Sequence, residues 1–158
     1  MAWKPDVTVA AIAEVDGQFL LVEERARGRL VLNQPAGHLE EGETFLDAVV
    51  RETLEETAWH FVPDQIVGVY LWRPTHIKTT FLRVCFNGAL QYHEAHRPLD
   101  EGILRTRWLS RAQLSAMQPR LRSPLVLRCV DDYLAGTRYP LELLTHLIQE
   151  PITIAASG

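Results

Sequence analysis

The sequence predicts an α/β fold in which a mixed β-sheet is covered by helices on both faces. Strand patterns and helix patterns follow one another along the chain, a hairpin signal stands near the start at Asp16-Gly17, and one strong helix pattern lies near the middle. The chain has 158 residues, of which 47% are apolar and 23% charged, as in globular proteins with one core. We therefore expect a single domain over residues 1–158.

The first elements are predicted to be two paired strands. Residues 7–13 are rich in β-branched and small side chains, Asp16-Gly17 is typical of a tight turn, and residues 18–23 resume the apolar run. Residues 24–30 carry four charges and one glycine, which indicates a mobile loop. Helix-breaking residues at 33–37 then end a short apolar stretch.

The strongest helix pattern follows this stretch and reaches about residue 58. Thr44 and Asp47, three residues apart, resemble a capping box at its start. Apolar side chains at i, i+4 and i+8 form the stripe that we expect to face the core: Leu46, Val50 and Leu54. Later patterns predict strands at 66–72, 79–86 and 104–109 and short helices at 111–117 and 124–135.

Charge and cysteine usage exclude several classes of protein. With 16 Lys+Arg against 20 Asp+Glu, the net charge of −4 disfavours a general nucleic-acid coat. Residues 1–6 reach an acid before any apolar segment, and no window approaches the roughly 18 apolar residues of a membrane span, so we expect a cytoplasmic protein without a membrane segment. Cys85 and Cys129 lie in apolar runs and are interpreted as small buried side chains.

The acidic residues are concentrated in one segment. Residues 39–56 hold seven acids and one base and so carry −6, which leaves +2 for the rest of the chain. Such a cluster repels itself, and either a bound cation or a solvated helix face can account for it.

The spacing of three glutamates favours the cation. Glu52, Glu55 and Glu56 fall within about 100° of arc on a helix, on the face that we expect to lie opposite the apolar stripe. Ligands that are all oxygen suit Mg²⁺ or Mn²⁺ rather than zinc.

The loop before the helix can support this face. Gly37 and Gly42 allow tight bends that bring Glu43 back against the helix. Arg51 could then pair with Glu43 and fix the helix face.

The fixed positions of this segment match a known signature. Gly37, five residues, Glu43, seven residues, Arg51-Glu52, two residues and Glu55-Glu56 together resemble the Nudix box of the Nudix hydrolases. The resemblance implies a Nudix-like α/β/α sandwich with a catalytic loop and helix. It also implies that Arg51, Glu52, Glu55 and Glu56 are catalytic, that the three glutamates hold Mg²⁺ or Mn²⁺, and that Gly37 and Glu43 are structural.

Two positions depart from the signature. Thr53 stands where an aliphatic residue is usual, and Ala58 replaces the glycine that follows the glutamate pair. Neither change removes a ligand. The second leaves open where the helix ends.

The resemblance extends beyond the box, over nearly the whole chain. The segments 4–10, 33–40, 121–126 and 138–142 resemble a bacterial phosphatase branch of the family. That resemblance implies removal of phosphate from nucleoside tri- and diphosphates and from hydroxymethylpyrimidine and thiamine pyrophosphates. The implied partner is thus a small-molecule nucleotide or cofactor pyrophosphate.

Other residues are candidates for the general base and for substrate binding. Some branches of the family recruit the base from a loop, and Glu94, Asp100 and Glu101 in the stretch 93–102 are candidates, with a solvated loop as the alternative. Lys4, Arg27 and Lys78 could offset phosphate charge, and Trp72, beside Arg73, and Phe81 could stack on a flat base. We retain Lys4 and Trp72 as substrate-binding candidates; plain surface and core packing are the alternatives. His93 and His96 lack metal-ligand spacing and are interpreted as loop histidines.

Two other functions remain open from the sequence. A nucleotide sensor could keep the fold without turnover, although it would need no set of metal carboxylates. A hydrolase of RNA 5′ ends is disfavoured by the net charge and by the absence of a Lys/Arg run. The apolar segment 141–148 is expected to pack on the body of the protein or on a partner chain, and both a monomer and a homodimer are compatible with the sequence.

Overall fold

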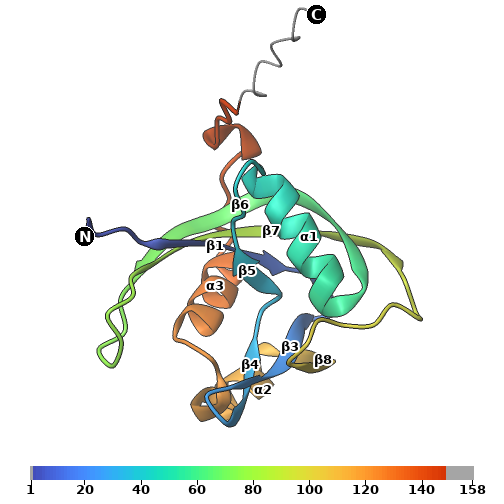
Figure 1. Cartoon of the computed structure of the whole chain (residues 1–158). Helices are drawn as coiled ribbons and strands as arrows, with labels where there is room; N and C mark the ends of the chain where they lie inside the picture. Colours follow the sequence, from blue (N-terminus) through green and yellow to red (C-terminus); the bar gives the residue numbers. More distant parts are fainter. Residues whose placement is uncertain (1, 149–158) are drawn as a thin grey trace, which may run out of the picture.

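The computed structural model describes residues 2–148, and a mixed four-stranded sheet runs through its centre (Figure 1). Its strands follow the order β5-β1-β7-β6 and comprise β5 (Ala36–His38), β1 (Asp6–Ile12), β7 (Phe81–His93) and β6 (Trp59–Trp72). β1 runs parallel to β7, whereas β5 and β6 pair antiparallel with their neighbours. The predicted mixed sheet is confirmed.

A second, fully antiparallel sheet was not predicted. It comprises β2 (Glu14–Val15), β3 (Gln18–Ala26), β4 (Arg29–Asn33) and β8 (Ile103–Ser110). Strands β2, β4 and β8 each pair with β3. The predicted pairing of 7–13 with 18–23 is therefore wrong, because β1 pairs with β5 and β7. The predicted turn at Asp16-Gly17 is present, but it joins β3 to the two-residue strand β2. β1 instead lies inside the mixed sheet, where it is almost fully buried on both faces, as is typical of a strand with a parallel neighbour.

The mobile loop predicted at 24–30 is a β-hairpin. β3 continues to Ala26 and β4 begins at Arg29, so only Arg27 and Gly28 form the turn. Both have positive φ, 51° and 74°, as a two-residue hairpin turn of right-handed twist requires. The four charges of this segment obscured its strand pattern; Glu24, for example, lies in β3 and pairs with Arg122.

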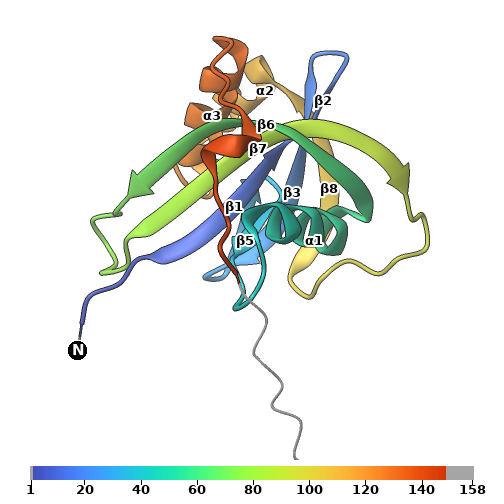
Figure 2. The ribbon, with the colours of Figure 1, turned by 90° about the horizontal axis from the view of Figure 1, so that it is seen from above.

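Helices cover both faces of the mixed sheet (Figure 2). α1 (Phe45–Thr57) packs on one face, where Val9, Val49 and Val84 belong to one apolar core. α3 (Leu125–Leu134) packs on the other, where Ala10, Cys85 and Val126 belong to a second core. The shorter helices are α2 (Arg111–Ala116), η1 (Gln118–Arg120) and η2 (Leu141–Leu143).

The buried face of α1 differs from the predicted stripe. Leu46, Val50 and Leu54 are only half-buried, whereas the fully buried positions are Ala48, Val49, Thr53, Glu56 and Thr57. Buried threonines are possible there because the Thr53 hydroxyl donates to the Val49 carbonyl at 2.7 Å and the Thr57 hydroxyl to the Thr53 carbonyl at 2.6 Å. The helix is thus rotated from the orientation that the leucines suggest.

The helix ends at Thr57. Ala58 adopts the left-handed conformation with φ of 63°, and its N–H donates to the Leu54 carbonyl at 2.8 Å. This is the conformation that a glycine adopts at a helix C-terminus, and it costs a non-glycine residue about 1 kcal/mol. Replacement of glycine by alanine has therefore not moved the end of the helix.

Strands β6 and β7 are longer than predicted. They form one antiparallel ladder from Trp59↔His93 to Trp72↔Phe81, with three shifts in register. The extra pairs carry polar and half-exposed side chains, whose pattern the sequence could not distinguish from a loop.

Both cysteines are buried, whereas the apolar segment 141–148 is buried only in part. Cys85 and Cys129 are both fully buried free thiols, as predicted. From the segment 141–148, Leu141 and Leu144 pack on the core beside α1, whereas Leu147 is 88% exposed. Over residues 2–148, no helix is long and apolar enough to cross a membrane.

Candidate active site

The loop between β5 and α1 is held by its own acidic residues. Thr44 and Asp47 form a complete capping box at the start of α1, which confirms the predicted start. Glu43 Oε1 accepts the N–H of Glu40 at 2.7 Å, and Gly42 has φ of 82°. The loop therefore turns back on the helix.

Arg51 holds this loop, the helix face and strand β5 together. It donates to both oxygens of Glu43 at 2.8 and 3.0 Å, to Glu52 at 2.9 Å, to Glu55 at 3.2 Å and to the His38 carbonyl at 3.0 Å. A guanidinium has five N–H donors, so these five bonds occupy the group. The bidentate hydrogen bond from Arg51 holds the pKa of Glu43 below its usual value. The Arg51–Glu43 pair expected from the spacing is present.

Three carboxylates converge at the exposed side of α1. Oxygen atoms of Glu52, Glu55 and Asp100 all lie within 4.8 Å of one another. Asp100 comes from the segment before β8, and its backbone N–H donates to the Glu55 carbonyl at 3.0 Å. We call these three residues the carboxylate cluster.

Glu56 does not belong to this cluster. It is only 7% exposed, and its Oε1 accepts the N–H of Ala36 in β5 at 2.8 Å. The expectation that Glu56 points away from the core is wrong, because the rotation of α1 turns it inward. Burial raises the pKa of Glu56 to about 9.

The environment of the cluster suits a divalent cation. Burial also raises the pKa of Glu52, although the neighbouring Arg51 opposes the shift. A cation beside these groups would favour their charged form. The ligand atoms are all carboxylate oxygens, the set that Mg²⁺ and Mn²⁺ prefer, so the residues present fit such an ion.

Gly37 provides the space in which Glu52 lies. A Cβ atom at position 37 would stand 2.1 Å from Glu52 Cδ and 2.2 and 2.3 Å from its two oxygens. The carboxylate of Glu52 thus occupies the volume of a missing side chain. Only glycine leaves this room, which explains a glycine in β5.

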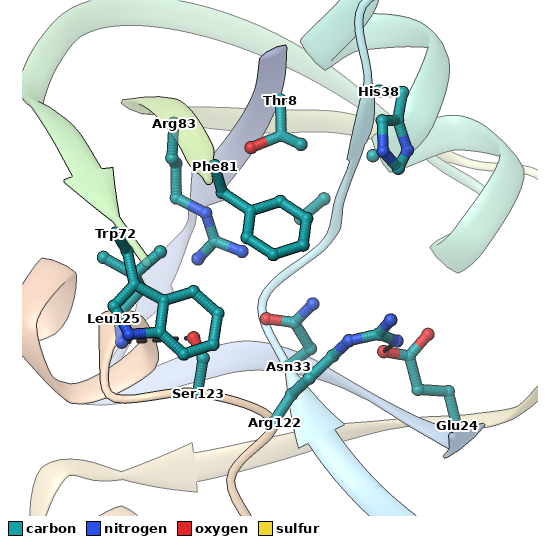
Figure 3. Close-up of a pocket in the computed structure, with 12 residues that line it drawn as sticks. Thr8, Glu24, Asn33, His38, Trp72, Phe81, Arg83, Arg122, Ser123 and Leu125 are labelled. Carbon is teal, nitrogen blue, oxygen red and sulfur yellow. Dashed lines mark hydrogen bonds and ion pairs between the residues drawn. The ribbon is translucent and has the colours of Figure 1, made fainter. Parts of the chain in front are cut away.

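A cavity of about 150 Å³ opens beside β5 (Figure 3). Ala36, Gly37 and His38 form one side of it, so it borders the residues that contact Glu52 and Glu56. Trp72 and Phe81 form an aromatic wall, their rings nearly parallel at 23° with centroids 5.6 Å apart. The remaining lining residues are mainly polar: Thr8, Glu24, Asn33, Arg83, Arg122, Ser123 and Leu125.

The predicted cations lie elsewhere. Lys4 is exposed ahead of β1, Arg27 is in the β3–β4 turn, Lys78 is in the β6–β7 loop, and none of the three lines this cavity. Arg83 and Arg122 line it instead. Sequence reasoning missed both, although Arg83 interrupts an apolar strand and that signal could have identified it.

Among the candidate bases, only Asp100 lies in the cluster. Glu94 pairs with His60 at 2.9 Å and with Arg97 at 3.5 Å, and Glu101 is exposed in a turn. His93 packs its ring against Trp59, and neither His93 nor His96 belongs to a possible metal-binding group within residues 2–148.

Comparison with known proteins gives consistent matches. The model of the NUDIX domain matches residues 3–128. Phosphatase NudJ from Escherichia coli (strain K12) is 40% identical over 142 residues, which cover 90% of this chain and 92% of that protein.

Solved structures agree. A NUDIX hydrolase from Nitrosomonas europaea superposes with a TM-score of 0.91 and 47% identity, covering 93% of this chain and 100% of the other. The MutT protein from Methanosarcina mazei Go1 shares the fold, with a TM-score of 0.67 and 24% identity, covering 86% of this chain and 99% of the other.

Proposed function

The chain belongs to the NUDIX domain family and is a Nudix hydrolase, and from this premise we propose that it releases phosphate from nucleoside tri- and diphosphates and from pyrimidine or thiamine pyrophosphates. We propose Mg²⁺ as the cofactor, with Mn²⁺ able to replace it. The convergence of Glu52, Glu55 and Asp100 carries this proposal. The similarity to a protein named phosphatase NudJ supports the choice of reaction.

In this proposal the carboxylates hold a divalent ion, and the chain positions them. Glu52, Glu55 and Asp100 supply oxygens, and Glu56 contributes from the buried side, where it is close enough for the charges of Glu52 and Asp100 to raise its pKa. A divalent ion held by these acids would supply the positive charge that a pyrophosphate needs in an acidic site and would make water a better nucleophile. Without it, the acidic site would repel the substrate.

Arg51 is proposed as a positioning residue. Its five hydrogen bonds all go to protein atoms, so it holds Glu52 and Glu55 in place and has no N–H left for substrate. Asp100 is our candidate for accepting the proton of the attacking water. It is the exposed member of the cluster, so its carboxylate is open to solvent water.

The cavity beside β5 is proposed to bind the part of the substrate that carries the ring. Trp72 and Phe81 offer a flat apolar wall, and the cavity borders on Gly37 next to the cluster. Lys4 is not in this cavity and drops out of the proposed binding site. We further propose that residues 1–158 form one domain, which the packing of Leu141 and Leu144 on the core supports.

The proposal is tested by phosphate release from a panel of nucleoside tri- and diphosphates and cofactor pyrophosphates, with product masses to identify phosphate or diphosphate. We expect activity with Mg²⁺ or Mn²⁺ and none in excess chelator, while far-UV circular dichroism stays unchanged because apolar cores hold α1. Full turnover in chelator would contradict the metal assignment.

Two variants distinguish a specific role of the carboxylate cluster from a general effect of negative charge in this segment. Glu55→Gln should lower kcat/KM by about 100-fold, because it removes charge where the ion binds. Glu41→Gln makes the same charge change at an exposed position of the preceding loop and should leave kcat/KM unchanged. Equal effects of the two substitutions would exclude a specific role for the cluster.

Glu56→Gln tests the buried glutamate. The amide oxygen of glutamine can still accept the Ala36 N–H, so the melting temperature in metal-free buffer should stay close to that of the parent protein. A fall of about 100-fold in kcat/KM with this stability retained supports a ligand role. A large fall in melting temperature would indicate that Glu56 serves only to join α1 to β5.

A further inference from the structure

The floor of the cavity beside β5 contains two side chains with unused hydrogen-bonding capacity. Asn33 and Arg83 are each 7% exposed and both line the cavity. Within residues 2–148, Oδ1 of Asn33 and Nε of Arg83 are buried and have no hydrogen-bond partner. Buried polar atoms are almost always paired in native proteins, so two such atoms in one cavity indicate a missing partner.

Arg83 also lacks a compensating charge. Its Nη1 donates to the neutral amide oxygen of Gln34 at 2.9 Å, and no ion pair joins it to an acid in the described part of the chain. By contrast, Arg122 in the same cavity is paired with Glu24. A buried guanidinium without an acid is costly unless something else accepts from it. The guanidinium therefore favours a ligand that brings an acceptor.

Other polar side chains of the cavity already have a hydrogen-bond partner. The Ser123 hydroxyl accepts the Leu125 N–H at 3.2 Å, and the Thr8 hydroxyl donates to the Leu82 carbonyl at 3.4 Å. Gln34 is held from the other side, where its amide donates to the Val126 carbonyl at 3.4 Å. Asn33 and Arg83 are thus the two lining residues that carry a buried polar atom without a partner in the described part of the chain.

The shape of the cavity adds a second constraint. Trp72 and Phe81 are cross-strand partners whose nearly parallel rings form one wall. Figure 3 shows Arg83, Trp72 and Asn33 directed toward the same space, with the guanidinium and the amide on different sides of it. A planar group lying against the aromatic wall would present its edge to both polar side chains.

We propose that Asn33 and Arg83 read the edge of a nitrogen heterocycle in the substrate, Asn33 Oδ1 accepting from an N–H of the ring and Arg83 donating to the adjacent carbonyl oxygen or ring nitrogen. This deepens the proposed function and rests on it. The cavity accordingly selects pyrophosphates that carry a nucleobase or a related ring with a donor next to an acceptor. A ring that lacks the donor leaves Asn33 Oδ1 buried and unpaired.

Binding of monophosphates tests this without relying on hydrolysis. Two matched pairs differ only at the donor: UMP with 3-methyl-UMP, and AMP with the 5′-monophosphate of purine riboside, which lacks the amino group. Ribose 5-phosphate lacks the ring. By titration calorimetry we expect the donor-bearing member of the better-bound pair to bind on the order of tenfold more tightly than its analogue, and ribose 5-phosphate to bind most weakly.

Variants assign this difference to the two residues. Asn33→Leu should remove the difference within the pair, because its side chain accepts from neither ligand. Arg83→Met should weaken both members of the pair by about tenfold and leave ribose 5-phosphate unchanged. Arg128→Met is the matched control: Arg128 is exposed on α3, pairs with Asp132 and does not line the cavity, so binding should be unchanged.

Several results would overturn the inference. The first is that both members of each pair bind with equal affinity, and the second is that ring-bearing monophosphates bind no better than ribose 5-phosphate. The third is that the difference in affinity within a pair persists in a folded Asn33→Leu protein. Weakening of ribose 5-phosphate by Arg83→Met would assign Arg83 to the phosphate instead. If Asn33→Leu does not fold, the matched pairs on the parent protein still decide. Tight ring binding without hydrolysis would refute the proposed function alone.

Discussion

Substitution of Gly37 by alanine should abolish most of the activity while leaving the fold intact. The new Cβ would stand 2.1 Å from Glu52 Cδ, whereas carbon atoms in contact lie about 3.5–4.0 Å apart. The carboxylate must therefore move by more than about 1 Å. The atoms displaced are the far end of a flexible side chain, so the backbone can stay in place.

The expected magnitude follows from that displacement. A misplacement of about 1 Å in a reacting geometry can cost on the order of 100-fold in rate. We expect kcat/KM of Gly37→Ala to fall by this factor, and the free energy of unfolding to change by less than about 1 kcal/mol. Steady-state kinetics at saturating Mg²⁺ and urea denaturation in metal-free buffer measure the two quantities.

A double-mutant cycle identifies the cause. In a Glu52→Ala protein the side chain that would clash is absent, so adding Gly37→Ala should cause no further loss. If the double variant instead loses kcat/KM by the product of the two single factors, Gly37 acts independently of Glu52. Near-normal activity of Gly37→Ala alone would refute the steric argument.

Three further substitutions test other parts of the structure. Trp72→Ala should raise KM for ring-bearing pyrophosphates more than it lowers kcat, since it removes part of the cavity wall; loss of folding would instead identify Trp72 as core. Burial alone would raise the pKa of Glu23, but Arg107, Arg105 and Arg120 together hold the pKa below its usual value. Glu23 therefore stabilises the fold above about pH 4.5, and this stability is lost as the pH falls through the lowered pKa. Glu23→Gln should therefore flatten the acid limb of the melting temperature between about pH 5 and 3, and an unchanged limb would contradict this. His146→Ala should lower the free energy of unfolding by about 1 kcal/mol in urea denaturation, because His146 Nε2 accepts the Phe45 N–H at the start of α1 at 3.1 Å; an unchanged midpoint would show that water replaces it.

The features that could be predicted from the sequence are local ones. Thr44 and Asp47 cap α1 as predicted, and the Arg51–Glu43 pair forms, because each depends on spacing along a loop and a helix. Glu52 and Glu55 come together for the same reason. A signature with fixed spacing describes such neighbourhoods well.

The features that could not be predicted depend on tertiary packing. The rotation of α1, which turns Glu56 inward, follows from its contact with β6 and β1, and residue spacing does not specify which face these strands cover. Asp100 joins the cluster only because the segment before β8 returns to α1. Asn33 and Arg83 lie in different sheets, so no sequence interval relates them.

Strand β5 has a thermodynamic consequence for catalysis. Its three residues form one side of the cavity. The Ala36 N–H also donates to Glu56, and the absence of a side chain at Gly37 leaves the space that the Glu52 carboxylate occupies. A ligand that shifts or stiffens β5 from the cavity side must change the free energy of the carboxylates on the other, and the linkage is reciprocal. If the cavity binds the ring and the carboxylates bind the ion, as proposed, the two binding events are coupled, and part of the binding energy of the ring can appear as a higher kcat rather than as a lower KM.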